Sequence, residues 1–307
     1  MTKRGYSRRD FLKFCGMLAA AAGMPGSARL ATQVLQSRAR LPVIWLEFQD
    51  CAGCTEAFTR SGAPSIIDLI LNKISIDYHE TLFAAAGTQA ERNRDETMKK
   101  YAGRYLLVVE GSIPSAADGA YCTIAGKAAP AIFREAAAGA KAVIAVGNCA
   151  CFGGIPKAAP NPTGARGIAE LSTGMPLACI AGCPPIPEAF TGTLAHLLIF
   201  GTLPELDELK RPSVFYGRTI HDRCLRRPQY DAGNFAVSFD DEGARKGWCL
   251  YGLGCKGPTT RNACPTMKWS GGLSFPVQSG HPCLGCSQPG FWDGGGFYAV
   301  QPTPEFR

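Results

Sequence analysis

Fourteen cysteines in a chain of 307 residues constrain this protein more than any other feature of its sequence. Most of them lie after residue 50, in short spacings such as Cys51-Ala-Gly-Cys54 and Cys283-Leu-Gly-Cys286. Dense cysteines serve either as disulfides, which small secreted domains need, or as ligands of metals and clusters. A chain of this length with 46% hydrophobic residues can build a sizeable core without disulfides, so the spacing favours ligation.

The first forty residues have the pattern of an export signal. Ser-Arg-Arg-Asp-Phe-Leu-Lys at 7–13 is a twin-arginine pattern, and a short, Ala-rich apolar run follows over 14–24. Residues 1–40 hold eight Lys and Arg against one Asp, and therefore carry the whole formal net charge of +7. The excess of positive charge thus belongs to a signal peptide cleaved somewhere in 26–40, and it is no evidence for nucleic acid binding.

The export route bears on the cysteines. Twin-arginine signals export proteins that have already folded, commonly with cofactors fitted in the cytoplasm, where cysteines that meet iron become cluster ligands before an oxidant reaches them. No second apolar run of membrane-spanning length follows, and the chain ends 21 residues after Cys286. We therefore expect a mature protein that is soluble in the periplasm, with no membrane anchor of its own.

Strand and helix patterns alternate over residues 41–211. The expected strands are 43–48, 74–78, 105–109, 142–146 and 177–180, and the clearest helices are 84–100, 127–138 and 186–200. The strand segments are apolar without alternation, which is typical of strands covered on both faces. This order predicts an α/β fold with a flavodoxin-like, doubly wound parallel sheet.

Residues 212–307 have a different composition, in which Gly, Pro, Cys and aromatic residues dominate and periodicity is weak. Such a segment has too little apolar periodicity to build a core by itself. We expect an irregular C-terminal domain that is stabilised by metal clusters.

Four cysteines in the first part follow predicted strands. Cys51 and Cys54 follow the first strand, Cys149 follows the fourth and Cys183 follows the fifth. In an open parallel sheet, ligands bind beyond the carboxyl ends of the strands, so three distant segments bring four thiols to one edge. Four thiolates are what a 4Fe–4S cluster requires. A structural zinc ion or a thioredoxin-like Cys-x-x-Cys site remain alternatives for these residues alone.

The second part holds six more cysteines and one candidate histidine. They are His221, Cys224, Cys249, Cys255, Cys264, Cys283 and Cys286. Seven ligands divide naturally into four and three, which suits a second 4Fe–4S cluster and a 3Fe–4S cluster that lacks one iron corner. Two zinc sites are the alternative, and they would make this domain purely structural.

Several ordered motifs resemble those of the small subunits of nickel–iron hydrogenases, from the leader to about residue 293. The motifs are Cys51-Ala-Gly-Cys54-Thr-Glu, Val109-Glu-Gly-Ser-Ile-Pro114, Gly147-Asn-Cys149, Gly182-Cys183-Pro-Pro185, Thr219-Ile-His221-Asp-Arg-Cys224, Gly254-Cys255-Lys-Gly-Pro-Thr259 and Gly280-His-Pro-Cys283-Leu-Gly-Cys286.

The resemblance implies a role for each ligand. The proximal 4Fe–4S cluster, nearest the active site, would be held by Cys51, Cys54, Cys149 and Cys183. The distal 4Fe–4S cluster, near the surface, would be held by His221, Cys224, Cys249 and Cys255. The medial 3Fe–4S cluster would be held by Cys264, Cys283 and Cys286. Pro276 lies where a fourth cysteine would otherwise stand.

The resemblance also implies a partner and a reaction. The catalytic nickel–iron centre belongs to a separate large subunit, so this chain has no catalytic residue of its own and relays electrons from H2 oxidation, which is reversible. The expected type is a cytochrome-c3 hydrogenase, with a multihaem c-type cytochrome as the carrier. The cluster subunit of respiratory complex I shares the proximal pattern, but it lacks the second Cys-rich domain and the twin-arginine leader.

Two glycines refine the expected type. Oxygen-tolerant, membrane-bound members of the resembled family carry two extra cysteines around the proximal cluster, at positions that correspond to Gly53 and Gly154 here. We therefore expect a standard, oxygen-sensitive enzyme.

Five residues near the expected sites receive a simpler interpretation. Cys122, Cys151 and Cys179 are expected to be small buried thiols rather than ligands. Asp50 and Glu56 flank the first cysteine pair, where a carboxylate could relay protons, but a solvated or capping acid is the favoured interpretation.

Overall fold

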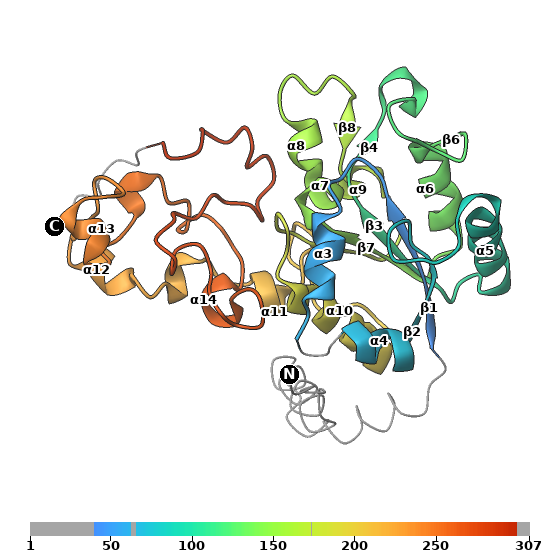
Figure 1. Cartoon of the computed structure of the whole chain (residues 1–307), viewed down its shortest axis with the longest axis horizontal. Helices are drawn as coiled ribbons and strands as arrows, with labels where there is room; N and C mark the ends of the chain where they lie inside the picture. Colours follow the sequence, from blue (N-terminus) through green and yellow to red (C-terminus); the bar gives the residue numbers. More distant parts are fainter. Residues whose placement is uncertain (1–39, 63–65, 173, 300–307) are drawn as a thin grey trace.

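The computed structural model describes residues 40–62, 66–172 and 174–299. The predicted signal peptide lies outside these residues, except for Arg40. We call 40–211 the sheet region and 212–299 the cysteine-rich region, and Figure 1 shows the second lying to one side of the first. Across the described ranges, no helix is both long and apolar enough to span a membrane.

The sheet region contains five parallel strands in the order β2-β1-β3-β7-β9. Their bounds are β1 Leu41–Glu47, β2 Ile74–Tyr78, β3 Leu106–Glu110, β7 Ala142–Val146 and β9 Leu177–Ile180. Numbered along the sheet, this is the flavodoxin-like order 2-1-3-4-5. The predicted doubly wound parallel sheet is confirmed.

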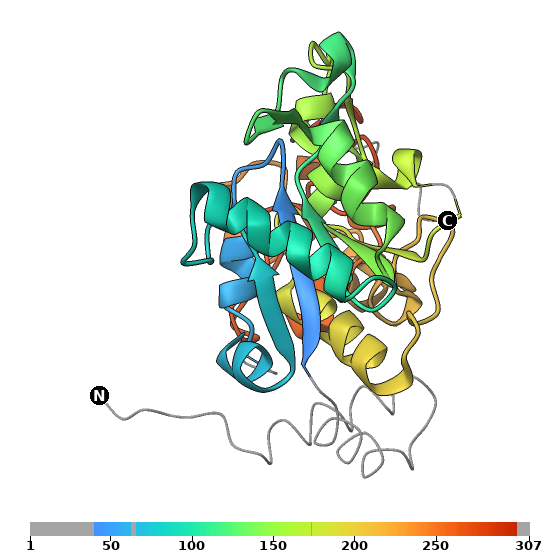
Figure 2. The ribbon, with the colours of Figure 1, turned by 90° about the vertical axis from the view of Figure 1, so that its right-hand side faces the viewer.

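Helices cover both faces of this sheet (Figures 1 and 2). On one face lie α3 (Gly53–Thr59) and α10 (Pro187–Phe200), and on the other lie α5 (Gly87–Lys100) and α6 (Ala129–Ala138). Every residue of β3 and β7 is buried, because these central strands have helices on both sides. That burial is the physical reason for the uninterrupted apolar runs in the sequence.

Several predicted boundaries differ from the structure. Strand β1 covers Leu41–Glu47 rather than 43–48, β3 covers Leu106–Glu110 rather than 105–109, and α10 begins at Pro187 rather than at 186. Helix α5 begins at Gly87 rather than at residue 84. Residues Lys127–Ala128 form strand β6, which pairs antiparallel with β5 (Thr123–Ile124), so α6 begins at Ala129 rather than at 127. The turn between the two short strands has positive φ at both Ala125 and Gly126, a hairpin geometry that helix propensity does not reveal.

Shorter elements complete the sheet region. They are α4 Ile66–Asn72, β4 Ile113–Pro114, η1 Ala116–Gly119, α7 Gly147–Phe152, α8 Gly154–Lys157, β8 Ala165–Arg166 and α9 Ile168–Leu171.

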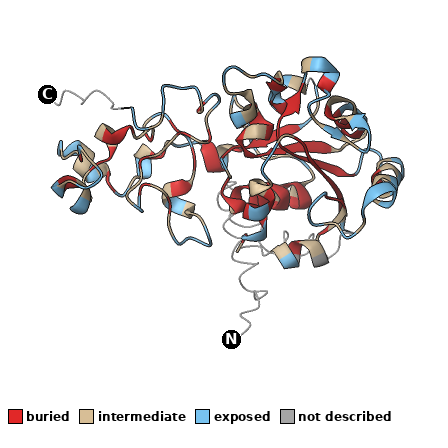
Figure 3. Ribbon diagram, turned by 45° about the horizontal axis from the view of Figure 1, so that its top comes forward, coloured by how far each residue is buried: buried red, intermediate tan, exposed pale blue. Residues whose placement is uncertain are grey.

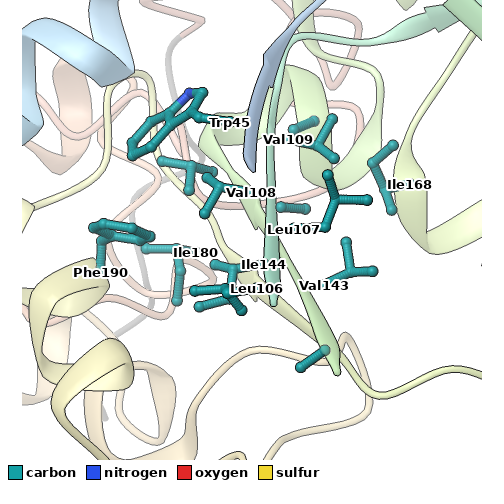
Figure 4. Close-up of a cluster of buried hydrophobic side chains, with 14 of the residues drawn as sticks. Trp45, Leu106, Leu107, Val108, Val109, Val143, Ile144, Ile168, Ile180 and Phe190 are labelled. Carbon is teal, nitrogen blue, oxygen red and sulfur yellow. The ribbon is translucent and has the colours of Figure 1, made fainter. Parts of the chain in front are cut away.

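The main core lies between the sheet and its helices (Figure 4). Trp45 of β1 packs against Phe58 of α3 and Phe190 of α10, with ring centroids 5.4 and 5.3 Å apart. The two phenylalanine rings meet edge-to-face at 5.1 Å. This aromatic group fixes α3, and with it the cysteine pair from which α3 begins, against the sheet.

The cysteine-rich region has only short helical turns. They are α11 Ser213–Tyr216, η2 His221–Arg223, α12 Arg227–Asp231, α13 Glu242–Arg245, η3 Tyr251–Leu253 and α14 Cys264–Met267. Its chain is mostly half-buried or exposed, whereas burial is concentrated in the sheet region (Figure 3). The two cores interlock, because Phe215 and Tyr216 belong to the core of the sheet region and Ile186 to the smaller core.

Candidate metal centres

The carboxyl edge of the sheet gathers the first set of cysteines. Strand β1 ends four residues before Cys51, β7 ends three residues before Cys149, and β9 ends three residues before Cys183. Helices α3 and α7 begin at Gly53 and Gly147, so Cys54 and Cys149 lie in their first turns. The structure therefore brings the three predicted strand-end segments to one edge.

The thiols of Cys51, Cys54, Cys149 and Cys183 form one mutually interacting set, in which all six pairs are close enough to affect each other's ionisation. Burial is the largest cause of the raised pKa of Cys54, and the charges of its three partner thiols raise it further. Burial also raises the pKa of Cys149 and of Cys183 to about 11. Such a set suits a cation or cluster that replaces the thiol protons.

Two glycines leave the space that the thiols occupy. A Cβ on Gly147, whose φ is +87°, would lie 2.3 Å from Sγ of Cys54. A Cβ on Gly154, whose φ is +54°, would lie 2.4 Å from Sγ of Cys149. Both glycines have positive φ and lie against a thiol of the set, so in this chain glycine lets the backbone approach the thiols closely.

Glu110 is a functional candidate that sequence reasoning missed. It is 1% exposed, and its Oε1 accepts the backbone N–H groups of Cys54 and Thr55 at 2.9 and 3.2 Å. Its Oε2 accepts the Thr55 hydroxyl at 2.6 Å and the Trp45 indole N–H at 3.3 Å. The carboxylate thus fixes the loop that carries the first cysteine pair. The sequence signal that could have identified Glu110 is its place as an acidic residue at the end of an otherwise apolar strand.

Glu47 is the register partner of Glu110 on the neighbouring strand β1. Burial, followed by the charge of Glu110, raises the pKa of Glu47 to about 7. Its Oε2 lies 3.6 Å from Nδ1 of His79, and burial lowers the pKa of that imidazole to about 4. Nδ1 accepts the N–H of Thr81 at 3.2 Å, so the ring is neutral and faces the carboxyl with a lone pair.

The two acids named from the sequence have simpler roles. Asp50 is exposed and caps the turn by accepting the N–H of Ala52 at 3.0 Å. Glu56 is exposed and pairs with Arg60 one helical turn later. Both agree with the favoured interpretation of capping or solvated acids.

Cys264, Cys283 and Cys286 form a second set in which all three pairs of thiols interact. Cys264 opens α14, and the other two lie in a loop that turns at Gly285, whose φ is +84°. Burial raises the pKa of Cys283 and of Cys286 to about 11.

Cys224, Cys249 and Cys255 form a third set, again with all three pairs interacting. His221 lies on the same loop, and its carbonyl accepts the N–H of Cys224 at 3.3 Å. Its ring packs edge-on against Tyr230, with centroids 4.4 Å apart. The structure thus joins His221 to this set through its backbone, and its role as a fourth ligand stays a prediction.

The three sets stand in a row with the second in the middle. The Cys183 thiol lies near enough to Cys286 for its charge to raise the pKa of the Cys286 thiol, after burial as the main cause. At the other end, the N–H of Cys283 donates to Sγ of Cys255 at 3.3 Å. One loop, 283–286, therefore lies beside both neighbouring sets.

A side chain next to a ligand links the two regions. The amide of Asn148 donates to the carbonyls of Cys286 and Gln288, at 3.0 and 2.9 Å. Asn148 is 2% exposed, and its neighbour Cys149 belongs to the first set. The first and second sets are thereby held at a fixed separation.

The remaining cysteines are not brought into these sets. Cys151 of α7 and Cys179 of β9 are fully buried, and the Cys151 thiol donates to the carbonyl of Ala145 at 3.4 Å. Cys122 is half-buried, and burial raises its pKa to about 11. All thirteen described cysteines are free thiols, so the described ranges contain no disulfide. A row of thiol sets without disulfides is typical of iron–sulfur proteins.

Comparison with known families agrees with this class. The family of NiFe/NiFeSe hydrogenase small subunits, in its C-terminal part, matches residues 216–299. The family described as NADH ubiquinone oxidoreductase, 20 Kd subunit, matches residues 51–197. The second match covers the sheet region, where the pattern shared with the complex I subunit was expected.

Whole-chain relatives extend the match across both regions. The chain is 50% identical to the uptake hydrogenase small subunit of Azotobacter vinelandii, over all of this chain and 86% of that relative. It is 46% identical to the hydrogenase-1 small chain of Escherichia coli K12, over 97% of this chain and 81% of that relative.

Among solved structures, the chain is similar to the NiFeSe hydrogenase of Desulfomicrobium baculatum, with 34% identity, a TM-score of 0.79 and coverage of 86% of this chain and 100% of that one. A NiFeSe hydrogenase from Desulfovibrio vulgaris Hildenborough gives 36% identity and the same TM-score, over 86% of this chain and 99% of that one. This chain belongs to the family of nickel–iron hydrogenase small subunits, iron–sulfur electron-transfer subunits that work as heterodimers with a large subunit.

Proposed function

We propose that this chain relays electrons through two 4Fe–4S clusters and one 3Fe–4S cluster, between the nickel–iron centre of a large subunit and a c-type cytochrome. The proximal cluster is assigned to Cys51, Cys54, Cys149 and Cys183, the distal cluster to His221, Cys224, Cys249 and Cys255, and the medial cluster to Cys264, Cys283 and Cys286. Each cluster, when bound, accepts and releases single electrons.

The row of thiol sets is the observation that carries the proposal. Cys286 of the middle set lies near enough to Cys183 of the first for the charge of one thiol to affect the other, and the N–H of Cys283 in the same loop donates to Sγ of Cys255 in the third. Structural zinc sites have no reason to adjoin one another, whereas electron transfer needs closely spaced centres. The contacts therefore favour a chain of redox groups rather than three separate structural metal sites.

The exposed thiols of the proximal set indicate where the large subunit would bind. Cys51 and Cys183 are exposed in this chain, whereas Cys54 beside them is half-buried. Ligand thiols left open to solvent would be open to oxidants. We infer that the large subunit shields this face and brings its nickel–iron centre next to the proximal cluster.

The chain's own residues orient and shield the proximal site. Glu110 holds the backbone of Cys54 and Thr55, and Trp45 closes the pocket behind that carboxylate. Glycines 147 and 154 allow the backbone to approach the cluster closely. Rigid, glycine-lined ligand loops keep the cluster's geometry, and hence its potential, constant during turnover.

The relatives' names favour one direction. Several are named uptake hydrogenases, which supports H2 oxidation, with electrons entering at the proximal set and leaving at the distal set. His221 is half-buried in an exposed loop beside Arg223, where a redox partner has access. We assign this exit to a multihaem c-type cytochrome such as cytochrome c3. Glycine at 53 and 154 supports a standard, oxygen-sensitive enzyme.

Location follows from the leader. The twin-arginine pattern at 7–13 supports export of the folded chain to the periplasm. Replacing Arg8 and Arg9 together with Lys should leave the hydrogenase in the cytoplasm, measured by activity staining of cell fractions. An unchanged periplasmic fraction would remove this part of the proposal.

Metal content tests the function directly. The complex, purified without oxygen from its native host through a tag on this chain, should hold about one nickel and roughly twelve irons. Iron near eleven without nickel would keep the three clusters but change the partner. Zinc in place of iron would remove the redox function and leave only the fold.

The carrier needs its own experiment. The complex should reduce cytochrome c3 with H2, at a rate that falls as salt is raised if surface charges guide docking. Reduction of a quinone analogue but not of the cytochrome would assign the exit to a membrane carrier instead.

A further inference from the structure

Arg226 is one of three arginines that are buried among the described residues, and the other two are Arg94 and Arg211. Each of those two guanidinium groups has a carboxylate partner, because Arg94 pairs with Glu91 at 2.6 Å and Arg211 pairs with Asp207 at 2.9 Å. A charge that is removed from water needs such a partner, since burial without one is strongly unfavourable. Arg226 is the exception, because no described carboxylate forms an ion pair with it.

Two carbonyl groups hold the guanidinium of Arg226 instead. Its Nε–H donates to the carbonyl of Val277 at 3.1 Å, and its Nη1–H donates to the carbonyl of Trp248 at 2.7 Å. A nearby acid, Asp231, is already paired with Arg227 at 2.7 Å. Carbonyl dipoles orient the group but carry no net charge. Within the described residues, the positive charge of Arg226 is therefore fixed in place and left without a negative partner.

The same hydrogen bonds place this charge beside the third thiol set. Trp248 directly precedes Cys249, and the backbone N–H of Arg226 itself donates to Sγ of Cys224 at 3.4 Å. Val277 belongs to the smaller apolar core, and Cys224 also packs against that core. Cysteines bind metals and clusters as thiolates, so the proposed function brings negative charge to the place where Arg226 lacks it.

We propose that Arg226 is the charge partner of the distal cluster and raises its reduction potential. The inference rests on the proposed function, in which Cys224 and Cys249 are distal ligands. A cluster held by thiolates becomes more negative when it takes up one electron, and a fixed positive charge in a buried setting stabilises that reduced form more than the oxidised form. Arg226 would therefore make the last site of the relay easier to reduce.

Two substitutions separate the charge from the hydrogen bonds. In the complete heterodimer, Arg226→Gln keeps an N–H donor and removes the charge, whereas Arg226→Lys keeps the charge. Redox titration followed by electron paramagnetic resonance should show a lower midpoint potential for one of the two four-iron signals in the Gln variant and a nearly unchanged one in the Lys variant. An unchanged potential in Arg226→Gln would overturn the proposal. An equal fall in both variants would also overturn it, because hydrogen bonding and not charge would then be the cause.

A matched control uses an arginine of the same loop that is exposed to solvent. Arg223 directly precedes Cys224, and water and salt screen an exposed charge. Arg223→Gln should therefore move the four-iron potentials much less than Arg226→Gln does. A shift of equal size would mean that burial of the charge has no part in the effect, and the proposal would fail.

Iron content decides the case if Arg226→Gln assembles without its distal cluster. The charge role predicts that Arg226→Lys keeps the roughly four irons that the Gln variant loses. Equal loss of iron in both variants would overturn the role. A second four-iron signal that is absent from the unmodified complex would instead remove the distal assignment and this inference with it, so the two failures are distinguishable.

Discussion

Among the described residues, the larger apolar core has forty members, all from the sheet region except Phe215 and Tyr216, whereas the smaller core has eight, all from the cysteine-rich region except Ile186. The larger core comes from strands buried on both faces and is large enough to fold by burial alone. The second region orders 88 residues around a small core that includes one of its own proposed ligands, Cys264. The difference teaches that one chain can use two sources of stability, apolar burial in one part and ligation in the other.

Removing the metal should separate the two regions most strongly. Each ordered residue loses about 1–2 kcal/mol of backbone entropy, which the small apolar core of this region cannot offset. Anaerobic chelation should therefore abolish amide protection across 212–299 and leave that of β3 and β7 largely intact, as measured by hydrogen exchange with mass spectrometry. Equal loss in both regions would show that the sheet region also depends on its cluster.

Gly147→Ala should disrupt the first thiol set, which lies at the edge of the sheet region next to the cysteine-rich region. The new Cβ would overlap Sγ of Cys54, so the complex should lose the proximal cluster, roughly four of its irons, in a direct iron assay. Gly126→Ala is the matched control, because its φ of +78° is similarly strained but nothing lies within 4 Å of the new Cβ. If Gly126→Ala lost as much iron, backbone strain and not the clash would be the cause.

Asn148→Ala should weaken the contact between the sheet region and the cysteine-rich region without removing a proposed ligand. Two carbonyls in the cysteine-rich region would lose their donor, at a cost of about 1–3 kcal/mol. Amides near Cys286 should exchange roughly tenfold or more faster, while β7 is unchanged. Asn161→Ala, whose amide bonds stay within a sheet-region loop at Ala165, should leave the amides near Cys286 as they are. A uniform change across both regions would contradict a local link.

Glu47→Gln should give the smallest effect, confined to the sheet region and dependent on pH. The folded chain raises the pKa of Glu47 from 4.5 to about 7 and so keeps a proton that the unfolded chain releases. The contribution of this carboxyl to stability is therefore full below pH 4.5 and is lost as the pH rises through about 7.

The variant removes that loss, so the melting temperature of the complex should rise at pH 8 and hardly change at pH 5. Glu56→Gln, on an exposed acid, should show no such pH dependence. A gain of equal size at both pH values would mean that packing, and not ionisation, explains the effect.

The two regions also differ in how far sequence alone predicts them. Strands β2, β7 and β9 were predicted to the residue, because burial on both faces leaves continuous apolar runs. The hairpin at 123–128 was missed, because its turn depends on positive φ at Ala125, which residue type does not signal. In the cysteine-rich region, spacing predicted the ligand residues but no secondary structure.

Contacts between distant residues were beyond the sequence. Spacing grouped the cysteines, and the family resemblance supplied the order of the sites, but neither showed that Cys283 and Cys286 each lie beside a different neighbouring set. Glu110 carries only a weak local signal, an acid at the end of an apolar strand. Its role arises only because that strand end meets the loop of Cys54 from another part of the chain.

The amide of Asn148 has one further consequence. Linked regions commonly rock against each other on slow timescales. Because Asn148 lies beside Cys149 and donates to the carbonyl of Cys286, the separation of the first two thiol sets depends on a local hydrogen bond and not on the tilt of whole regions. The outer parts of the molecule can then move while the distance between these two sets stays nearly constant.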